Sequence, residues 1–121
     1  MPYLILRIKS FKDASRGLIL FSKENHARIH LISSVLVNAL AFLLEVSRLE
    51  WCVLLLCCAL VLGMEALNSA LERLTDLISP DWNKQAGLVK DVAAGAVLIV
   101  SLFSGVIGLI IFFPHLRALI H

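Results

Sequence analysis

Apolar residues fall into three long stretches along the chain, separated by short polar segments, and this pattern predicts three membrane-spanning helices. The first stretch covers residues 29–46 and is close to the lower limit of roughly 17 residues for a helix that crosses a bilayer. The third covers residues 92–113 without a charged side chain, and as an α-helix it would rise about 33 Å. Both stretches are therefore long enough to cross the hydrocarbon core of a membrane.

The middle stretch differs from the others because only its first part is free of charge. Residues 51–64 are uncharged, but helix-forming residues continue as MEALNSALERLTDLI up to Ile78, and Ser79-Pro80 would then end the helix. A helix over residues 51–78 would be about 42 Å long, which is more than the hydrocarbon core needs. We therefore expect its second half to emerge into the membrane interface.

Residues 1–28 precede the first predicted span and combine apolar with basic side chains. The apolar residues recur at roughly helical spacing, with lysine and arginine between them, which is typical of an amphipathic helix at a membrane surface. Hydrophobic residues make up 60% of the whole sequence, whereas about half is usual in a soluble domain. The predicted fold class is an all-α integral membrane protein, forming one domain over residues 1–121, with three transmembrane helices after an interfacial helix.

Lysine and arginine are concentrated before the first span, and their distribution predicts the orientation of the protein. The turn between the first two spans has only Arg48, whereas six basic residues precede the first span: Arg7, Lys9, Lys12, Arg16, Lys23 and Arg28. By the positive-inside rule, the N-terminus and the loop between the second and third spans face the cytoplasm. We therefore expect a multi-pass protein of the inner, cytoplasmic membrane. The net charge of +2 is too small to suggest a nucleic acid as a partner.

A stripe of polar residues lies within the second predicted helix and comprises Glu65, Asn68, Ser69, Glu72 and Asp76. At about 100° per residue these positions share one narrow face of the helix, and Arg73 is expected to point elsewhere. A carboxylate at membrane depth is costly and is usually functional, so the stripe indicates a candidate site. The alternative is a buried ion pair that holds helices together, and the number of polar residues on one face makes that interpretation the weaker one.

The predicted topology brings charged residues from three segments to the cytoplasmic interface, in sequence order Glu24, Arg28, Glu72, Asp76, Lys90 and Asp91. Carboxylates from different elements, here Glu24 and Glu72, suit Mg²⁺, which often completes its coordination with nucleotide phosphates. Lys90 could hold a phosphate as a point charge, and the deeper Glu65 could act as general base toward a hydroxyl. Together these groups would support in-line phosphoryl transfer, where positioning and charge neutralisation dominate.

Other interpretations of the same residues remain open on the pattern alone. Carboxylate clusters also occur in ion transporters, so the chain could be a small oligomeric cation transporter or channel subunit with an acidic path, or a non-catalytic scaffold. No GxxxxGK[ST], HRD or DFG motif is present, which excludes the familiar soluble kinase folds. His26 and His30 are expected to lie at the interface without acting as ligands, and Asp91 could cap the third helix.

The polar stripe and the segment after it are similar to a known family. Residues 65–98, EALNSALERLTDLISPDWNKQAGLVKDVAAGAVL, resemble the signature of the prokaryotic diacylglycerol kinase and undecaprenol kinase family, and ENHARIH at residues 24–30 resembles its other acidic motif. The resemblance extends over nearly the whole chain. It implies a membrane lipid kinase that transfers the γ-phosphate of ATP to the hydroxyl of diacylglycerol or undecaprenol. The product would be phosphatidic acid or undecaprenyl phosphate, and the RIH after Ala27 is closer to the undecaprenol kinases.

The resemblance also implies roles for individual residues. Glu65 matches the catalytic base, Glu24 and Glu72 match the Mg²⁺-binding acids that also lie at the nucleotide, and Asn68 matches an asparagine that supports the active site. The remaining nucleotide-binding positions correspond to Asp76, Lys90 and Asp91. Members of the family are homotrimers whose active sites are shared between neighbouring protomers, so the same assembly is implied here.

Overall fold

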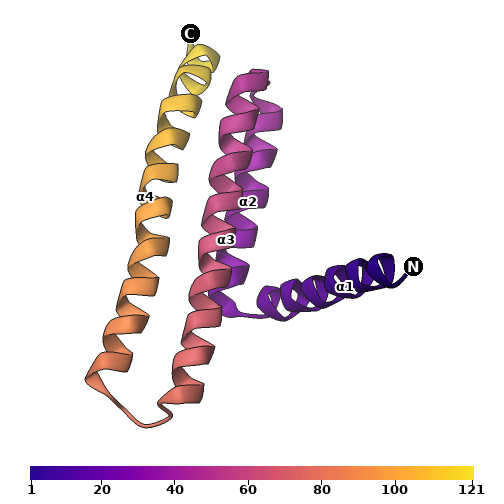
Figure 1. Cartoon of the computed structure of the whole chain (residues 1–121). Coiled ribbons are helices and arrows are strands. Elements are labelled where there is room, and N and C mark those ends of the chain that lie inside the picture. The colour runs from indigo at the N-terminus through magenta and orange to yellow at the C-terminus, as the bar shows by residue number, and fades with distance from the viewer.

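The computed structural model describes all 121 residues and consists of four α-helices without a strand. In chain order these are α1 (Pro2–Ser22), α2 (Asn25–Leu43), α3 (Arg48–Ile78) and α4 (Lys84–Ile120). Helices α2, α3 and α4 run side by side as a bundle, and α1 leaves the bundle sideways near the loop that joins α3 to α4 (Figure 1). The three bundle helices are long and apolar enough to cross a membrane, which confirms the predicted fold class.

Helix α3 is the central element because it packs against both α2 and α4. It begins in a capping box that is visible in the sequence as SRLE. The Ser47 hydroxyl accepts a hydrogen bond from the Glu50 backbone N–H at 3.2 Å, and the Glu50 carboxylate accepts one from the Ser47 N–H at 2.8 Å. This reciprocal arrangement satisfies donors that a helix start otherwise leaves unpaired. The end of α3 at Ile78 is where the Ser79-Pro80 pair predicted it.

Helix α4 is longer than the apolar stretch 92–113 that predicted it. It begins after Asn83, whose side-chain oxygen accepts hydrogen bonds from the backbone N–H groups of Gln85 and Ala86. It continues through Pro114 without ending there. The prediction that Asp91 caps this helix is therefore wrong, because polar residues before the apolar stretch extend the helix and the asparagine supplies the cap.

The helices bury few side chains against one another. A small apolar cluster ties α2, α3 and α4 together at the end of the bundle farther from α1, and its members are Ala41, Val46, Leu54, Ile111 and Phe112. At the same end, His115 Nε2 on α4 lies 3.0 Å from the Glu50 carboxylate on α3. Helix α1 buries no residue at all, in agreement with its predicted place at a membrane surface. In a membrane, lipid covers apolar side chains that water would otherwise contact.

Candidate active site

The charged residues singled out above lie at the end of the bundle where α1 joins it and the α3–α4 loop turns. Glu24 is the residue before α2, in extended conformation, and its side chain crosses to α3 instead of capping its own helix. Ser69 donates a hydrogen bond to one oxygen of Glu24, and Arg73 donates to the other from Nη2 at 2.8 Å and from Nε at 3.2 Å. The first acidic motif and the polar stripe are thus in direct contact.

The position of Arg73 corrects the expectation that it points away from the stripe. Arg73 is four residues after Ser69, so the two side chains lie only about 40° apart around the helix. The long arginine side chain spans this offset and reaches the same carboxylate that Ser69 binds. Sequence spacing alone could not reveal the contact, because the third partner, Glu24, comes from a distant segment, just before α2.

These contacts change the acidity of Glu24. The hydrogen bond from Ser69, and then the hydrogen bonds and charge of Arg73, favour the ionised carboxylate and hold the pKa of Glu24 below its ordinary value of 4.5. A carboxylate whose pKa is lowered on folding stabilises the folded state above its unfolded pKa, and this contribution is lost as the pH falls through the folded pKa.

We therefore expect the Glu24 contribution to stability to be complete near neutral pH and to decline below pH 4.5, the ordinary value of the group. Thermal unfolding in detergent between about pH 7 and about pH 3.5 measures it for wild type and for Glu24→Gln. The wild-type advantage over the variant should shrink toward the acid end. An advantage that stays constant over this range would contradict the prediction.

Glu65 lies deeper in the bundle than Glu24 and is the most buried carboxylate of the protein. The residue is 4% exposed. The nearest charged or titratable partner comes from α2, where His30 Nε2 lies 3.6 Å from Glu65 Oε2. The expectation that His30 is merely an interfacial residue missed this pair. The sequence feature that could have indicated the pair is a histidine inside an apolar span. Its partner could not be predicted, because it depends on the register of α2 against α3.

Asn68 and Glu72 continue the stripe toward the end of the bundle. Asn68 is buried, and its amide nitrogen donates a long hydrogen bond of 3.5 Å to Glu72 Oε1. Its side-chain oxygen is buried without any hydrogen-bond partner. Glu72 itself is exposed. A buried amide oxygen without a donor is uncommon in folded proteins and is free to bind a ligand or a cation.

Lys90 and Asp76 connect α4 to the same end of α3. Lys90 Nζ lies 2.5 Å from Asp76 Oδ1, and the carboxylate of Glu72 also attracts the Lys90 ammonium. Asp91, the neighbour of Lys90, is exposed and is not part of these contacts. The predicted site residues thus fall into three groups along α3: Glu24 contacts Ser69 and Arg73, Glu65 lies beside His30, and Glu72 and Asp76 face Lys90 on α4. Asp91 belongs to none of them.

The oxygen donors fit a hard cation such as Mg²⁺, although they form no closed cage. No group of three or more histidine, cysteine or acidic residues has metal-binding spacing. Mg²⁺ is commonly held by one or two carboxylates together with substrate phosphates, so such a cage is not required. Glu72 and the unpaired oxygen of Asn68 are of the right donor type, whereas the two oxygens of Glu24 already accept hydrogen bonds from Ser69 and Arg73.

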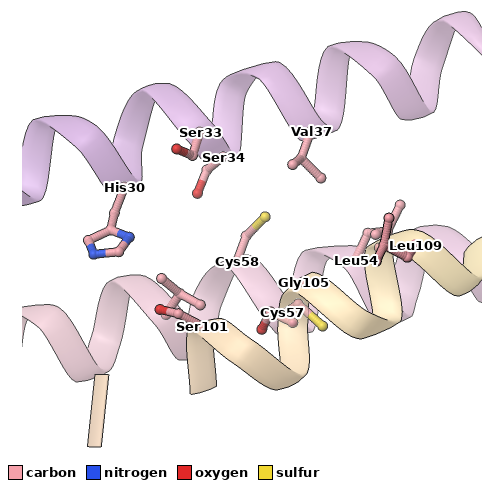
Figure 2. Close-up of a pocket in the computed structure, with 13 residues that line it drawn as sticks. His30, Ser33, Ser34, Val37, Leu54, Cys57, Cys58, Ser101, Gly105 and Leu109 are labelled. Carbon is pink, nitrogen blue, oxygen red and sulfur yellow. The ribbon is translucent and has the colours of Figure 1, made fainter. Parts of the chain in front are cut away.

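A cavity of about 400 Å³ lies between α2, α3 and α4 and begins beside His30. Figure 2 shows His30 at one end of the cavity and Leu54 and Leu109 at the other. Its lining is unusually rich in small polar side chains, namely Ser33, Ser34, Ser101 and Ser104. The hydroxyl of Ser101 is buried without a hydrogen-bond partner. The sequence did not indicate this cavity, because three helices form it.

The sequence is similar to known proteins over most of its length. A family model described as prokaryotic diacylglycerol kinase matches residues 12–112. An undecaprenol kinase from Bacillus subtilis (strain 168) is 37% identical over 109 residues, a match that covers 89% of each chain. A diacylglycerol kinase from a Synechocystis species is 35% identical over 112 residues, which cover 91% of this chain and 64% of that longer protein.

Proposed function

Because the chain belongs to the prokaryotic diacylglycerol kinase family and is a membrane lipid kinase, we propose that its active site is the charged end of the α2–α3–α4 bundle, with Glu65 as general base. The observation that carries this proposal is the depth of Glu65. This carboxylate is 4% exposed, one to two helical turns farther into the bundle than the exposed carboxylate of Glu72. A lipid hydroxyl can reach the deeper group, while phosphates dissolved in water can reach the shallower one.

The different depths of Glu65 and Glu72 suggest how the reaction proceeds. Glu65 takes the proton of the lipid hydroxyl as the alcohol oxygen forms a bond to the γ-phosphorus of ATP. The bond between that phosphorus and the oxygen bridging to ADP breaks, and ADP leaves. Because the transition state for phosphoryl transfer is loose, the protein contributes mainly by aligning the two oxygens and by neutralising charge. A base that is partly withdrawn from water is suited to removing a proton from an alcohol.

Glu72 and Glu24 would hold Mg²⁺, with Asn68 beside Glu72. When bound, the cation neutralises the charge of the phosphates and orients them. The donor oxygen of Asn68 is unpaired and Glu72 is exposed to solvent, which supports this assignment. Oε2 of Glu24 accepts a single hydrogen bond, from Ser69, so it retains a lone pair with which Glu24 could join the cation while Oε1 stays paired with Arg73.

Lys90, Asp76 and Asp91 would complete the nucleotide site. Lys90 carries the positive charge that phosphate needs, and its pairing with Asp76 keeps that charge at the mouth of the site. Asp91 is exposed at the adjacent position of α4, where it could contact the nucleotide from the solvent side. Asp76 and Asp91 are thus peripheral, so their loss should reduce activity less than the loss of Glu65 or Glu72.

The charge distribution supports a location in the inner, cytoplasmic membrane with this end of the bundle in the cytoplasm. The basic residues cluster before α2 and in or near the α3–α4 loop, as the positive-inside rule requires for cytoplasmic segments. ATP is then available on the side where Glu24, Glu72 and Lys90 lie. The proposed assembly is a homotrimer with shared active sites, and native mass spectrometry of the detergent-solubilised protein would measure its mass.

The test of the function is transfer of labelled phosphate from ATP to a panel of lipid alcohols, with Mg²⁺ and the purified full chain in lipid or detergent. Transfer to at least one alcohol is expected. The relatives are named for undecaprenol and for diacylglycerol, so both acceptors belong in the panel, and their relative rates identify the preferred one. Absence of transfer to every alcohol would overturn the proposal. The comparisons do not favour the alternative of a cation transporter or channel subunit.

A further inference from the structure

His30 and Glu65 form a polar pair inside the part of the bundle that crosses the membrane. The side chains are 24% and 6% exposed, and the pair joins α2 to α3. Glu65 makes no hydrogen bond to any other group of the chain, so His30 is its single polar partner. A buried carboxylate without a donor is strongly disfavoured, which makes the identity of that partner important.

The separation of 3.6 Å between His30 Nε2 and Glu65 Oε2 is slightly longer than a hydrogen bond. In enzymes without substrate, hydrogen bonds within the active site are often long and shorten when the substrate binds. His30 can make this adjustment because its ring lines the cavity of about 400 Å³ and is not packed on all sides. A movement of the ring of less than 1 Å would bring Nε2–H within hydrogen-bond distance of Oε2.

The pair is not needed to hold the helices together. Helix α2 is already fixed to α3 by the bonds of Glu24 to Ser69 and Arg73, and by Ala41, which packs in the apolar cluster with Leu54 of α3. Helix α4 is fixed to α3 by Lys90 and Asp76 and by His115 and Glu50. If His30 served only to hold α2 against α3, it would duplicate these contacts. The effect that no other contact supplies is the orientation of the Glu65 carboxylate.

We propose that His30 is the positioning residue for Glu65, donating from Nε2–H to Oε2 so that Oε1 faces the lipid hydroxyl. The inference rests on the proposed role of Glu65 as general base. Oε1 takes the hydroxyl proton as the alcohol oxygen bonds to the γ-phosphorus and ADP departs. His30 touches no reacting atom. It fixes the carboxylate in one rotamer, as hydrogen-bonded partners fix metal-ligating side chains, and the loss of such a partner commonly costs about 10- to 100-fold.

The experiment compares His30→Met, which removes the donor at similar volume, with His30→Gln, whose amide N–H can replace Nε2–H. We expect His30→Met to lower kcat for lipid phosphorylation about 10- to 100-fold while the KM for ATP stays within about twofold. His30→Gln should recover most of the lost kcat. The matched control is His121→Met at the exposed C-terminus, for which kcat should equal wild type. Thermal unfolding of each variant shows whether it is folded.

Three outcomes would overturn the proposal: wild-type kcat for His30→Met, equal loss in His30→Met and His30→Gln with both proteins folded, or a rise in the KM for ATP that accounts for the whole effect. Glu65→Gln, measured alongside, separates this inference from the proposed function. If Glu65→Gln is inactive and His30→Met is not impaired, only the role of His30 fails. If Glu65→Gln is fully active, the proposed base itself is wrong. In the double variant that combines His30→Met with Glu65→Gln, kcat should be no lower than in Glu65→Gln alone.

Discussion

Glu65→Gln is expected to lower kcat for lipid phosphorylation by about 10² to 10⁴, the usual contribution of a general base. Glutamine has nearly the shape of glutamate but cannot accept the hydroxyl proton, so the substitution removes the chemistry with little change in packing. Binding of ATP should be unchanged, because the nucleotide contacts proposed for Glu72 and Lys90 are intact. Steady-state kinetics with radiolabelled ATP and a nucleotide-binding titration measure the two quantities.

The control for this variant is Glu45→Gln. Glu45 is exposed in the turn between α2 and α3, at the opposite end of the bundle from the candidate site. The Glu45→Gln variant should retain the wild-type kcat. If Glu65→Gln lost less than about threefold, or if the two variants behaved alike, Glu65 would not be the base.

Glu72→Gln should cause the second large loss, and of a different kind. Removing a carboxylate that binds Mg²⁺ weakens cation binding, so the Mg²⁺ concentration for half-maximal activity should rise by about tenfold or more. At a fixed Mg²⁺ concentration the rate should fall by about 10², because the cation stabilises the charge of the transition state. Each tenfold loss of rate corresponds to about 1.4 kcal/mol of that stabilisation. A titration of activity against Mg²⁺ separates this effect from a loss of the base, for which the Mg²⁺ dependence is unchanged.

Asp76→Asn is the matched control, because Asp76 lies one turn beyond Glu72 on the same face of α3 and is also exposed. It pairs with Lys90 and is not proposed to bind the cation. We expect a smaller loss of activity, with the Mg²⁺ dependence close to wild type. If the Mg²⁺ dependence changed in Asp76→Asn and not in Glu72→Gln, the cation would bind Asp76, and the assignment to Glu72 would be wrong.

Much of the fold could be predicted because its helices are determined by local patterns. Apolar stretches indicated the three bundle helices, and Ser79-Pro80 indicated the end of α3 at Ile78. The limits of α4 were less accurate, because an apolar stretch marks the part of a helix that lies in lipid and not its polar ends. The cap at Asn83 lies well before that stretch.

The residues of the candidate site were also largely visible in the sequence, because carboxylates within or next to apolar stretches are rare. Which residues touch was not visible. Arg73 was expected to point away from the stripe and instead binds Glu24, and the pair of His30 with Glu65 was not predicted. In each pair one residue lies in α3 and the other lies in α2 or just before it, so the contacts depend on the register of α2 against α3.

The sequence by itself determined that this protein is helical and membrane-embedded, because hydropathy acts locally along the chain. It also indicated which acids belong to the candidate site, because carboxylates within or next to apolar stretches are rare. The tertiary structure decided how deep each carboxylate lies and what pairs with it. Glu65 is buried beside His30, Glu72 is open to solvent, and Glu24 is held by Ser69 and Arg73. The physical reason is that burial and pairing depend on the packing of neighbouring helices, which no single segment specifies.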